Sequence, residues 1–270
     1  MLSMDRRKFV RSSLLTGAVL GSGIPRAAAA SGDNRKSMKQ QWYELRTYQF
    51  REAGQQALTG AYLEQAAIPA LNRLGLKNIG VFSELKPEGP VAKTFLLIPF
   101  DSIEAFTGLE ARLAKDAVYT KAGEAYLSAA ANSPAYERIE SSLLKAFAHM
   151  PSVEVPEKRE RLFELRIYES PTEAAGQKKI EMFNEAGEID IFKKIGARPV
   201  FFGETLIGLR RPNLTYMLCF DNMEAHDSHW KAFGSDPEWK KISAIPEYSD
   251  ARLISKITRV FLTPAACSQI

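Results

Sequence analysis

The chain has 270 residues, of which 45% are hydrophobic and 25% charged, and this composition excludes an extensively disordered or fibrous protein. Its formal net charge is +4, and residues 1–30, with five basic residues and one acidic residue, carry all of that excess. A nucleic-acid-binding protein needs clustered positive charge on its folded part, so we expect no nucleic-acid partner.

The first 30 residues have the organisation of an export signal. A charged start, MDRRKFVR at 4–11, precedes a weakly apolar stretch at 12–24 and the small-residue sequence PRAAAAS at 25–31. The paired arginines resemble the twin-arginine signal of bacteria. We predict a signal peptide at 1–30 that is cleaved near Ala30, a linker at 31–41, and a bacterial protein that is periplasmic or otherwise exported. An ordinary secretory signal or an uncleaved anchor is the alternative, although the apolar stretch is too short to cross a bilayer.

A sequence repeat with a spacing of 120 residues follows the leader. YELRTY at 43–48 recurs as FELRIY at 163–168, and the same spacing aligns FLLIPFDSIEAF with TYMLCFDNMEAH and DAVYTK with DPEWKK. Three blocks in one frame indicate a duplicated domain. We predict repeats at 42–147 and 161–262, a proline-containing linker at 148–160, and a tail at 263–270.

Each repeat predicts the same order of elements along the chain. Alternating, aromatic-rich sequence predicts a first strand, and apolar residues spaced by four then predict a helix that Pro69 should bend or shorten in the first repeat. Two strands, a helix capped by Asp101 or Asp221, and a last strand follow. The predicted strands span 41–50, 77–84, 92–99 and 138–147 in the first repeat, and 161–170, 198–206, 213–220 and 251–262 in the second.

This order is that of an α+β, ferredoxin-like βαββαβ fold, in which all helices cover one face of the sheet and the first and third strands are central. The other face must also be buried. Two copies in one chain achieve this by packing sheet to sheet, so we predict an α/β barrel. A homo-oligomer of such chains is a further expectation.

The aromatic-ELR-x-Y strand, its duplication and the Asp-Pro-Glu-Trp-Lys helix at 236–240 resemble the NIPSNAP family of the dimeric α/β-barrel superfamily. The resemblance covers about 42–147 and 161–262. It implies the barrel fold, and relatives in the superfamily include cofactor-independent monooxygenases and haem-binding enzymes. Fold alone does not fix chemistry, so no activity follows from the resemblance.

Alternation along the first strand of each repeat separates an apolar row from a polar row. Because we expect the apolar row to pack under the helices, we predict that the polar row points into the barrel interior. The residues of that candidate ligand site are Glu44, Arg46, Tyr48, Glu164, Arg166 and Tyr168.

Two interpretations of this polar set remain open. In one, Glu and Arg pair with each other and form a filled polar network that fixes sheet pairing. In the other, the network lines a cavity in which Arg binds an anionic or carbonyl group, Tyr donates a hydrogen bond, and Glu orients Arg or acts as a base. Glu84 and Glu204, at matching positions on the second strands, extend this layer or face solvent.

His226 and His229 lie one helical turn apart and have the spacing of a metal-binding pair. The first repeat has Phe106 and Leu109 at the matching positions, and we expect the helix to lie outside the barrel. We therefore predict no cofactor, with a metal or haem at this pair as the minor alternative. Cys219 and Cys267 are expected to be independent thiols.

Trp230, Phe233 and Trp239 surround the GSDPEW turn. They predict either a core plug over the barrel mouth or an aromatic lid for a small ligand.

The sequence thus favours an exported small-molecule-binding protein or cofactor-independent, oxygenase-like enzyme with its site in the barrel interior. The alternative is a structural or protein-interaction module that oligomerises. Whether the protein is an enzyme stays open.

Overall fold

The computed structural model describes residues 39–270, so the predicted signal peptide at 1–30 lies outside the described residues. The first repeat contains β1 (Trp42–Gln49), α1 (Ala53–Tyr62), η1 (Leu63–Ala67), α2 (Ile68–Arg73), β2 (Gly80–Glu84), β3 (Thr94–Phe100), α3 (Ile103–Thr107), α4 (Leu109–Leu113), α5 (Ala117–Ala122), α6 (Glu124–Leu127) and β4 (Arg138–Ala146). The second contains β5 (Leu162–Glu169), α7 (Glu173–Asn184), α8 (Glu188–Lys194), β6 (Arg198–Ile207), β7 (Asn213–Phe220), α9 (Met223–Ser235), α10 (Pro237–Ser243), η2 (Pro246–Tyr248), α11 (Asp250–Leu253) and β8 (Lys256–Pro264).

The eight strands form one closed barrel in the order β1-β3-β2-β8-β5-β7-β6-β4, and all neighbours are antiparallel. Each repeat supplies four consecutive strands, with β1 and β3, or β5 and β7, at the centre. The repeats join where β2 pairs with β8 and β4 pairs with β6. The predicted fold, two ferredoxin-like repeats packed sheet to sheet as an α/β barrel, is confirmed.

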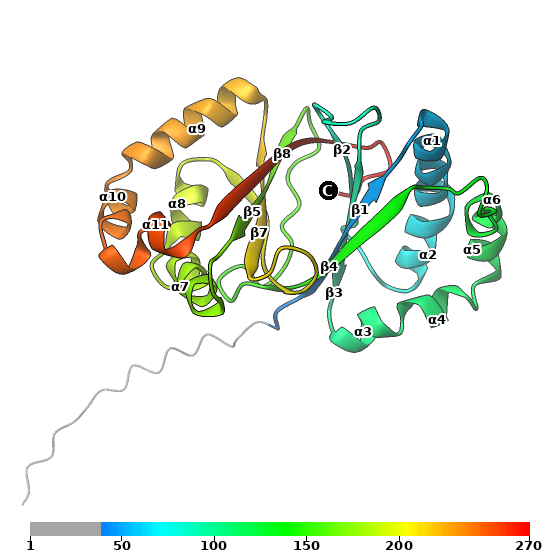
Figure 1. Ribbon diagram of the computed structural model, residues 1–270, viewed down its shortest axis with the longest axis horizontal. Coiled ribbons are helices and arrows are strands. Elements are labelled where there is room, and N and C mark those ends of the chain that lie inside the picture. Colours follow the sequence, from blue (N-terminus) through cyan, green and yellow to red (C-terminus); the bar gives the residue numbers. More distant parts are fainter. Residues whose placement is uncertain (1–38) are drawn as a thin grey trace, which may run out of the picture. The chain divides into compact units, whose positions relative to one another are not determined.

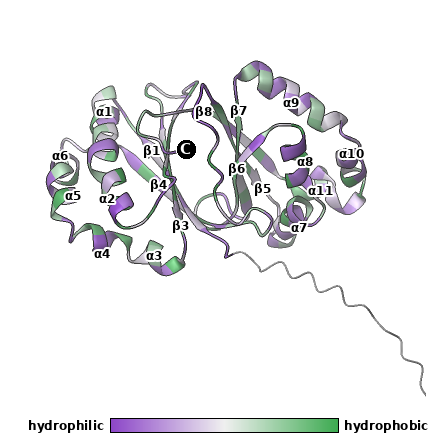
Figure 2. Cartoon of the chain, turned by 180° about the vertical axis from the view of Figure 1, so that it is seen from behind, coloured by the Kyte–Doolittle hydropathy of each residue, from purple (hydrophilic) through white to green (hydrophobic). Residues whose placement is uncertain are grey.

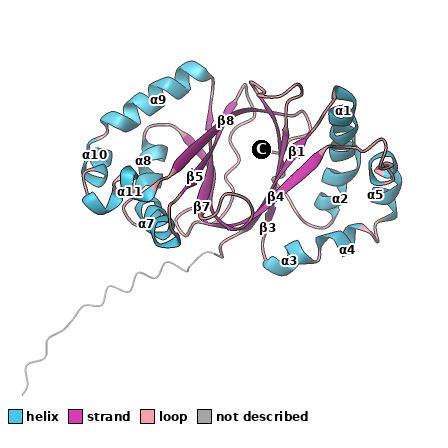
Figure 3. Cartoon of the chain, in the orientation of Figure 1, coloured by secondary structure: helices cyan, strands magenta, loops and turns pink. Residues whose placement is uncertain are grey.

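The helices lie on two opposite outer sides of the barrel, α1–α6 over the sheet of the first repeat and α7–α11 over the sheet of the second (Figures 1 and 3). The helices carry both hydrophobic and hydrophilic residues, as elements with one buried face require (Figure 2). Both faces of every central strand are therefore covered, one by the barrel interior and one by helices.

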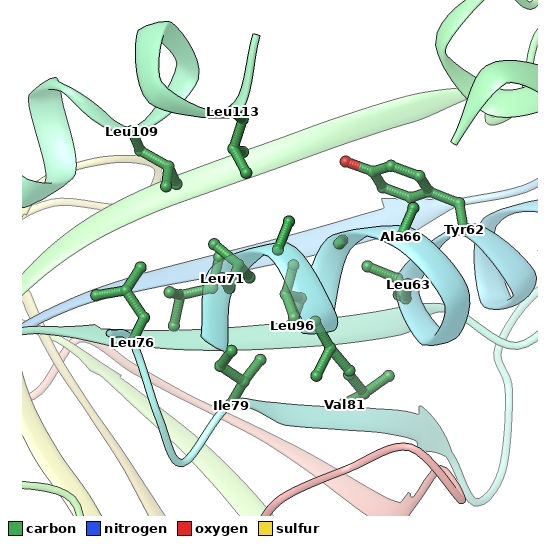
Figure 4. Packing of buried hydrophobic residues seen from close by; sticks show 14 of the residues in the cluster. Tyr62, Leu63, Ala66, Leu71, Leu76, Ile79, Val81, Leu96, Leu109 and Leu113 are labelled. Atoms are coloured by element: carbon green, nitrogen blue, oxygen red, sulfur yellow. The ribbon is translucent and has the colours of Figure 1, made fainter. Parts of the chain in front are cut away.

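Packing divides the apolar residues into an interior core and two helix-facing cores. The interior core contains residues of both repeats, among them Tyr43, Leu45, Phe82, Phe95, Leu97, Leu144, Phe163, Leu165, Phe201, Met217, Cys219 and Leu262. In the first helix-facing core, Tyr62, Leu63 and Leu71 pack on Leu96 of β3 (Figure 4). The second is dominated by aromatic side chains around Phe183, Phe192 and Tyr216.

The first helix passes Pro69 through a π-helical turn, η1, and does not end there. Proline lacks the backbone N–H and clashes with the carbonyl of the preceding turn, and the wider turn makes room for the ring. The helix that follows the third strand of each repeat, α3 or α9, begins one residue after its predicted start. Its cap is Ser102 or Asn222, in place of the predicted Asp101 or Asp221. Their side chains accept hydrogen bonds from the backbone N–H groups of Ala105 and Ala225.

The linker and the tail close one end of the barrel. Val153 and Ile270 lie in the interior core, and the N–H of Val81 donates to Ser268 Oγ at 3.0 Å. Cys219 and Cys267 are free thiols, as predicted, and burial raises the pKa of Cys219 to about 11. Within residues 39–270, no helix has the length and apolar character needed to cross a bilayer.

Candidate functional site

The polar row of the first strands faces the helices and not the barrel interior, so the predicted placement of all six site residues was wrong. Tyr43 and Leu45 belong to the interior core, whereas Tyr48 belongs to the core under α1–α5. In the second repeat Phe163 and Leu165 are interior, and Tyr168 packs under the helices. The corrected positions apply to Glu44, Arg46, Tyr48, Glu164, Arg166 and Tyr168.

The inversion has a physical cause. Alternation identifies the buried face of a strand when the other face meets water, but here Tyr43 and Glu44 are 0% and 4% exposed, so both faces are buried. Around Tyr43 and Leu45 the barrel interior is filled by apolar side chains of both sheets. A charged group there would have no partner, which is unfavourable. The helix-facing side offers hydrogen-bonding side chains and a path to solvent.

In the first repeat the arginine of the motif is paired within the protein, although Glu44 Oε2 and the Tyr48 hydroxyl are buried without a hydrogen-bond partner in the described residues. Arg46 Nε donates to Glu44 Oε1 at 2.6 Å, and Ser141 Oγ donates to the same oxygen at 2.7 Å. The Arg46 guanidinium also reaches Glu110 at 3.3 Å. Only about 10 Å³ of space remains between this part of the sheet and its helices. The filled-network interpretation therefore describes this copy.

In the second repeat the same arginine is held differently. The Arg166 guanidinium carbon lies 4.2 Å from the centre of the Trp230 ring, and its Nε is 3.7 Å from Glu164 Oε1, which is too long for a hydrogen bond. Arg166 Nε is buried and has no hydrogen-bond partner in the described part of the chain. Glu164 is engaged elsewhere, because Trp230 Nε1 donates to its Oε2 at 2.9 Å.

An open groove of about 520 Å³ lies beside Arg166, between the sheet of the second repeat and its helices. We call it the repeat-two groove. Its lining comes from β5, β8 and five helical segments around them and includes Arg166, Tyr168, Lys179, Glu188, His226, Asp227, Trp230, Phe233, Trp239, Asp250 and Arg259. The two copies of one motif thus differ in that one is packed shut and the other borders a groove.

A second arginine stands directly opposite the first. Arg259 on β8 is the cross-strand partner of Arg166 on β5, and both line the groove. None of the ion pairs formed within residues 39–270 involves Arg259. In the first repeat the partner of Arg46 at this position is Ser141. Like charges in directly opposed positions are unfavourable, so this pair favours an anionic group between the two guanidinium groups.

Sequence reasoning missed Lys179 and Glu188, which lie at the inner end of the groove. Lys179 is 1% exposed, with its Nζ 3.5 Å from Glu188 Oε2 and 3.4 Å from Asp250 Oδ1. The sequence signal that could have revealed Lys179 is its position on the apolar face of α7, beside Met182 and Phe183. Burial raises the pKa of Glu188, and the nearby Lys179 ammonium offsets this only in part. Burial also raises the pKa of Tyr168 to about 12, so its hydroxyl stays protonated at neutral pH.

His226 and His229 contact different partners. His226 is 6% exposed, and its Nε2 lies 3.3 Å from Glu164 Oε2 while its Nδ1 lies 2.8 Å from Asp227 Oδ1. The His229 ring packs near Gly196. Residues 39–270 contain no group of three or more ligating side chains placed to hold a metal ion. The helix of His226 lies outside the barrel, as predicted, but this histidine contributes to the groove.

Three aromatic side chains, Trp230, Phe233 and Trp239, pack over the groove and Phe192. Of the two interpretations of this cluster, the plug over the barrel mouth is therefore wrong, and the aromatic lid stays a prediction. Glu84 and Glu204 are also not equivalent. Glu84 faces the barrel interior and accepts from the N–H of Lys93, whereas Glu204 accepts from Gln177 on α7. A bulge in β6 between Pro199 and Phe201 reverses the face of the residues that follow.

The closed barrel of two ferredoxin-like halves, with a charged groove between sheet and helices, defines a protein of the dimeric α/β-barrel type. The NIPSNAP family model matches twice, at residues 43–151 and 163–269. The chain belongs to the NIPSNAP family, in which it carries two tandem domains.

Solved structures with the same fold are distant in sequence. A candidate monooxygenase from Fusobacterium nucleatum subsp. nucleatum has a TM-score of 0.55 at 8% identity, covering 84% of this chain and 93% of its own. One from Lactobacillus acidophilus has a TM-score of 0.55 at 10% identity, with coverages of 83% and 94%. An anthrone oxidase-like protein has a TM-score of 0.52 at 11% identity, with coverages of 85% and 93%. Comparison with curated proteins gave no significant match.

Proposed function

We propose that this protein binds a small, planar, anionic organic molecule in the repeat-two groove. The observation that carries the proposal is the cross-strand pair Arg166 and Arg259, which borders a 520 Å³ groove and has one buried nitrogen without a hydrogen-bond partner. Arginine binds carboxylate and enolate oxygens through paired N–H donors. The indole of Trp230 supplies an aromatic wall.

The groove has the composition of a ligand site. Pockets that bind small molecules combine aromatic walls with a few convergent polar groups. Trp230, Phe233 and Trp239 provide the walls, and the Arg166–Arg259 pair provides the anion anchor. At the inner end, Lys179 is already neutralised by Glu188 and Asp250, so it does not compete with the arginines for the anion.

The first repeat supplies a matched control for this proposal. Salicylate, a planar aromatic carboxylate, is the probe, and its affinity is measured by titration calorimetry for Arg166→Met and Arg46→Met. We expect Arg166→Met to weaken binding at least about tenfold, because a charge-assisted contact is lost, while Arg46→Met binds like the parent. Equal losses in both variants, or saturable binding that survives Arg166→Met, would overturn the proposal.

We further propose oxygenase-like chemistry in the same groove, motivated by the candidate monooxygenases and the anthrone oxidase-like protein that share the fold. An arginine pair stabilises the enolate of a substrate, which is the electron-rich form that reacts with molecular oxygen. For anthrone as probe, one anthrone and one O₂ give one anthraquinone and one water. An oxygen electrode measures the uptake, which we expect Arg166→Met to abolish and Arg46→Met to preserve. A rate of oxygen uptake no higher than that without protein would contradict the catalytic proposal but not the binding proposal.

The alternative function is a non-enzymatic structural or interaction module. The first repeat favours it, because there the same motif holds β1, β4 and α4 together and leaves almost no space. This alternative predicts that neither arginine variant changes the binding of any small anion. It also predicts a homo-oligomer, which sedimentation equilibrium tests.

Export through the twin-arginine route to the bacterial periplasm also stays a proposal, supported by the Arg6-Arg7 pair and the small residues before position 31. A reporter fused after residues 1–40 should reach the periplasm, and replacement of Arg6 and Arg7 by lysine should keep it in the cytoplasm. A reporter that still reaches the periplasm after both substitutions would contradict this route.

A further inference from the structure

The barrel interior is divided into a packed half and an open half. The interior core fills the end that Val153 and Ile270 close. Toward the other end lies a cavity of about 290 Å³, lined by residues from all eight strands. It lies on the inner face of the sheet and shares only Arg259 of its lining with the repeat-two groove.

Inward positions change from apolar to polar at the same level of the barrel on several strands. On β1 the inward-facing Leu45 is succeeded by Thr47, the next inward position of the strand. On β4 the inward position next to Leu144 is Ser142. On the second sheet the same change gives three threonines that face the cavity. They are Thr205 on β6, Thr215 on β7 and Thr258 on β8.

Hydrogen bonds between lining residues fix the polar wall. The hydroxyls of Thr205 and Thr215 donate to Asn213 Oδ1 at 2.7 and 3.2 Å, and Asn213 Nδ2 donates to the carbonyls of Leu209 and Arg210 at 3.0 Å each. Asn213 is 5% exposed and is therefore held rigidly. Because both threonine protons are used, their oxygen lone pairs remain as acceptors toward the cavity.

Charges of both signs line this wall and nearly balance. Glu84 is 8% exposed and accepts from the backbone N–H of Lys93 at 2.9 Å, and the Lys93 ammonium lies 3.4 Å from its other oxygen. With Glu88, Glu140, Lys86, Arg210 and Arg259, the lining holds three carboxylates and four cations in all. The cavity floor is apolar, formed by Leu45, Phe95, Leu165 and Val260.

We infer that the open half of the barrel is a second binding site, for a small neutral amphiphile with an apolar body and an N–H or O–H donor. The apolar floor excludes water from favourable contact and accommodates the body. The fixed hydroxyl oxygens accept from the donor, and the nearly balanced charges favour a neutral ligand over an ion. Exposed Leu209, at 53%, lies on the rim through which such a ligand enters.

Indole, with an apolar body and one N–H donor, is the probe, and its binding is followed by two-dimensional ¹H–¹⁵N NMR on the full chain. Saturable shifts are expected at the amides of Thr47, Thr215 and Thr258. Thr47→Trp fills the cavity and should weaken binding at least about tenfold. Thr120→Trp places the same side chain on the exposed α5 helix and should leave the affinity unchanged.

Arg166→Met separates this site from the repeat-two groove, because it should weaken salicylate binding at least about tenfold and leave indole binding intact. Should Thr47→Trp fail to fold, the shift map of the parent protein decides alone. Shifts centred on Trp230 and Arg166, or the absence of saturable shifts, would overturn the inference.

Discussion

The two arginines of the repeated motif occupy equivalent strand positions and differ in what surrounds them. Arg46 has a short ion pair with Glu44, while Arg166 lies over Trp230 and opposite Arg259. The neighbouring residues differ as well, because the cross-strand partner is Ser141 in one repeat and Arg259 in the other. At the residue scale, duplication has therefore left one copy that stabilises the fold and one that borders a groove.

Arg259→Ser places the first repeat's residue in the second. Because it removes a like charge opposite Arg166, we expect the ligand-free protein to become more stable by up to about 0.5 kcal/mol. The same change should weaken salicylate binding at least about tenfold. Urea unfolding and calorimetry measure the two effects. Lower stability together with unchanged affinity would show that Arg259 is not part of an anion site.

Glu188 predicts a pH-dependent contribution to stability. Burial raises its pKa in the folded state, so the protonated carboxyl favours folding. This contribution is fully present below the pKa of the unfolded chain, about 4.3, and is lost as pH rises through the folded-state pKa. Glu188→Gln should therefore lose stability relative to the parent at pH 4.5 and recover it toward pH 7.5. A difference that changes in the opposite direction would show that the Lys179 ion pair outweighs burial.

At the element scale, helix caps shape the two helix-facing surfaces in matching ways. Asp236 caps α10, accepts from the N–H groups of Glu238 and Trp239, and pairs with Lys194. Asp116 caps α5 at the matching position of the first repeat and pairs with Arg73. Only α10 also carries a groove residue, Trp239.

Asp236→Ala and Asp116→Ala should each lower the free energy of unfolding by about 1 kcal/mol, because each removes a helix cap. Asp236→Ala should also weaken salicylate binding, since it loosens the helix that carries Trp239. Denaturant unfolding gives the stability change, and calorimetry gives the affinity. Equal affinities in the two variants would mean that α10 does not shape the groove.

The sequence predicted the order of elements and the barrel because the repeat gave two independent copies of each pattern. The prediction of which face of β1 and β5 points into the barrel was wrong. Both faces, such as those carrying Tyr43 and Glu44, are buried, and alternation cannot tell two buried faces apart. The bulge in β6 has no sequence signal comparable to a repeat, so the difference in face between Glu84 and Glu204 was not predicted. Lys179, Glu188 and Arg259 were missed because they meet Arg166 only through tertiary packing.

At the scale of the whole molecule, the barrel is closed by pairing between repeats. β8 of the second repeat completes the sheet beside β2, and β4 of the first completes it beside β6. Val153 of the linker and Ile270 of the tail lie in the interior that both sheets share. Neither repeat buries its inner face alone, so we expect one cooperative unfolding transition.

A chain of residues 39–155 alone would expose the interior side chains of the first sheet, among them Tyr43, Phe82 and Leu144. We expect it to dimerise or aggregate and to recover a single barrel when mixed with residues 156–270. Sedimentation equilibrium measures these states. A stable monomer of the first repeat would contradict the shared interior.

The central claim, that the first copy of the motif is structural and the second functional, is tested most directly by the unfolding free energies of Arg46→Met and Arg166→Met. Arg46→Met leaves the buried Glu44 carboxylate without its cation and should cost about 2 to 3 kcal/mol. Arg166→Met should cost less than about 1 kcal/mol, because Trp230 and His226 still hold Glu164. Equal costs, or a larger cost for Arg166→Met, would contradict the account.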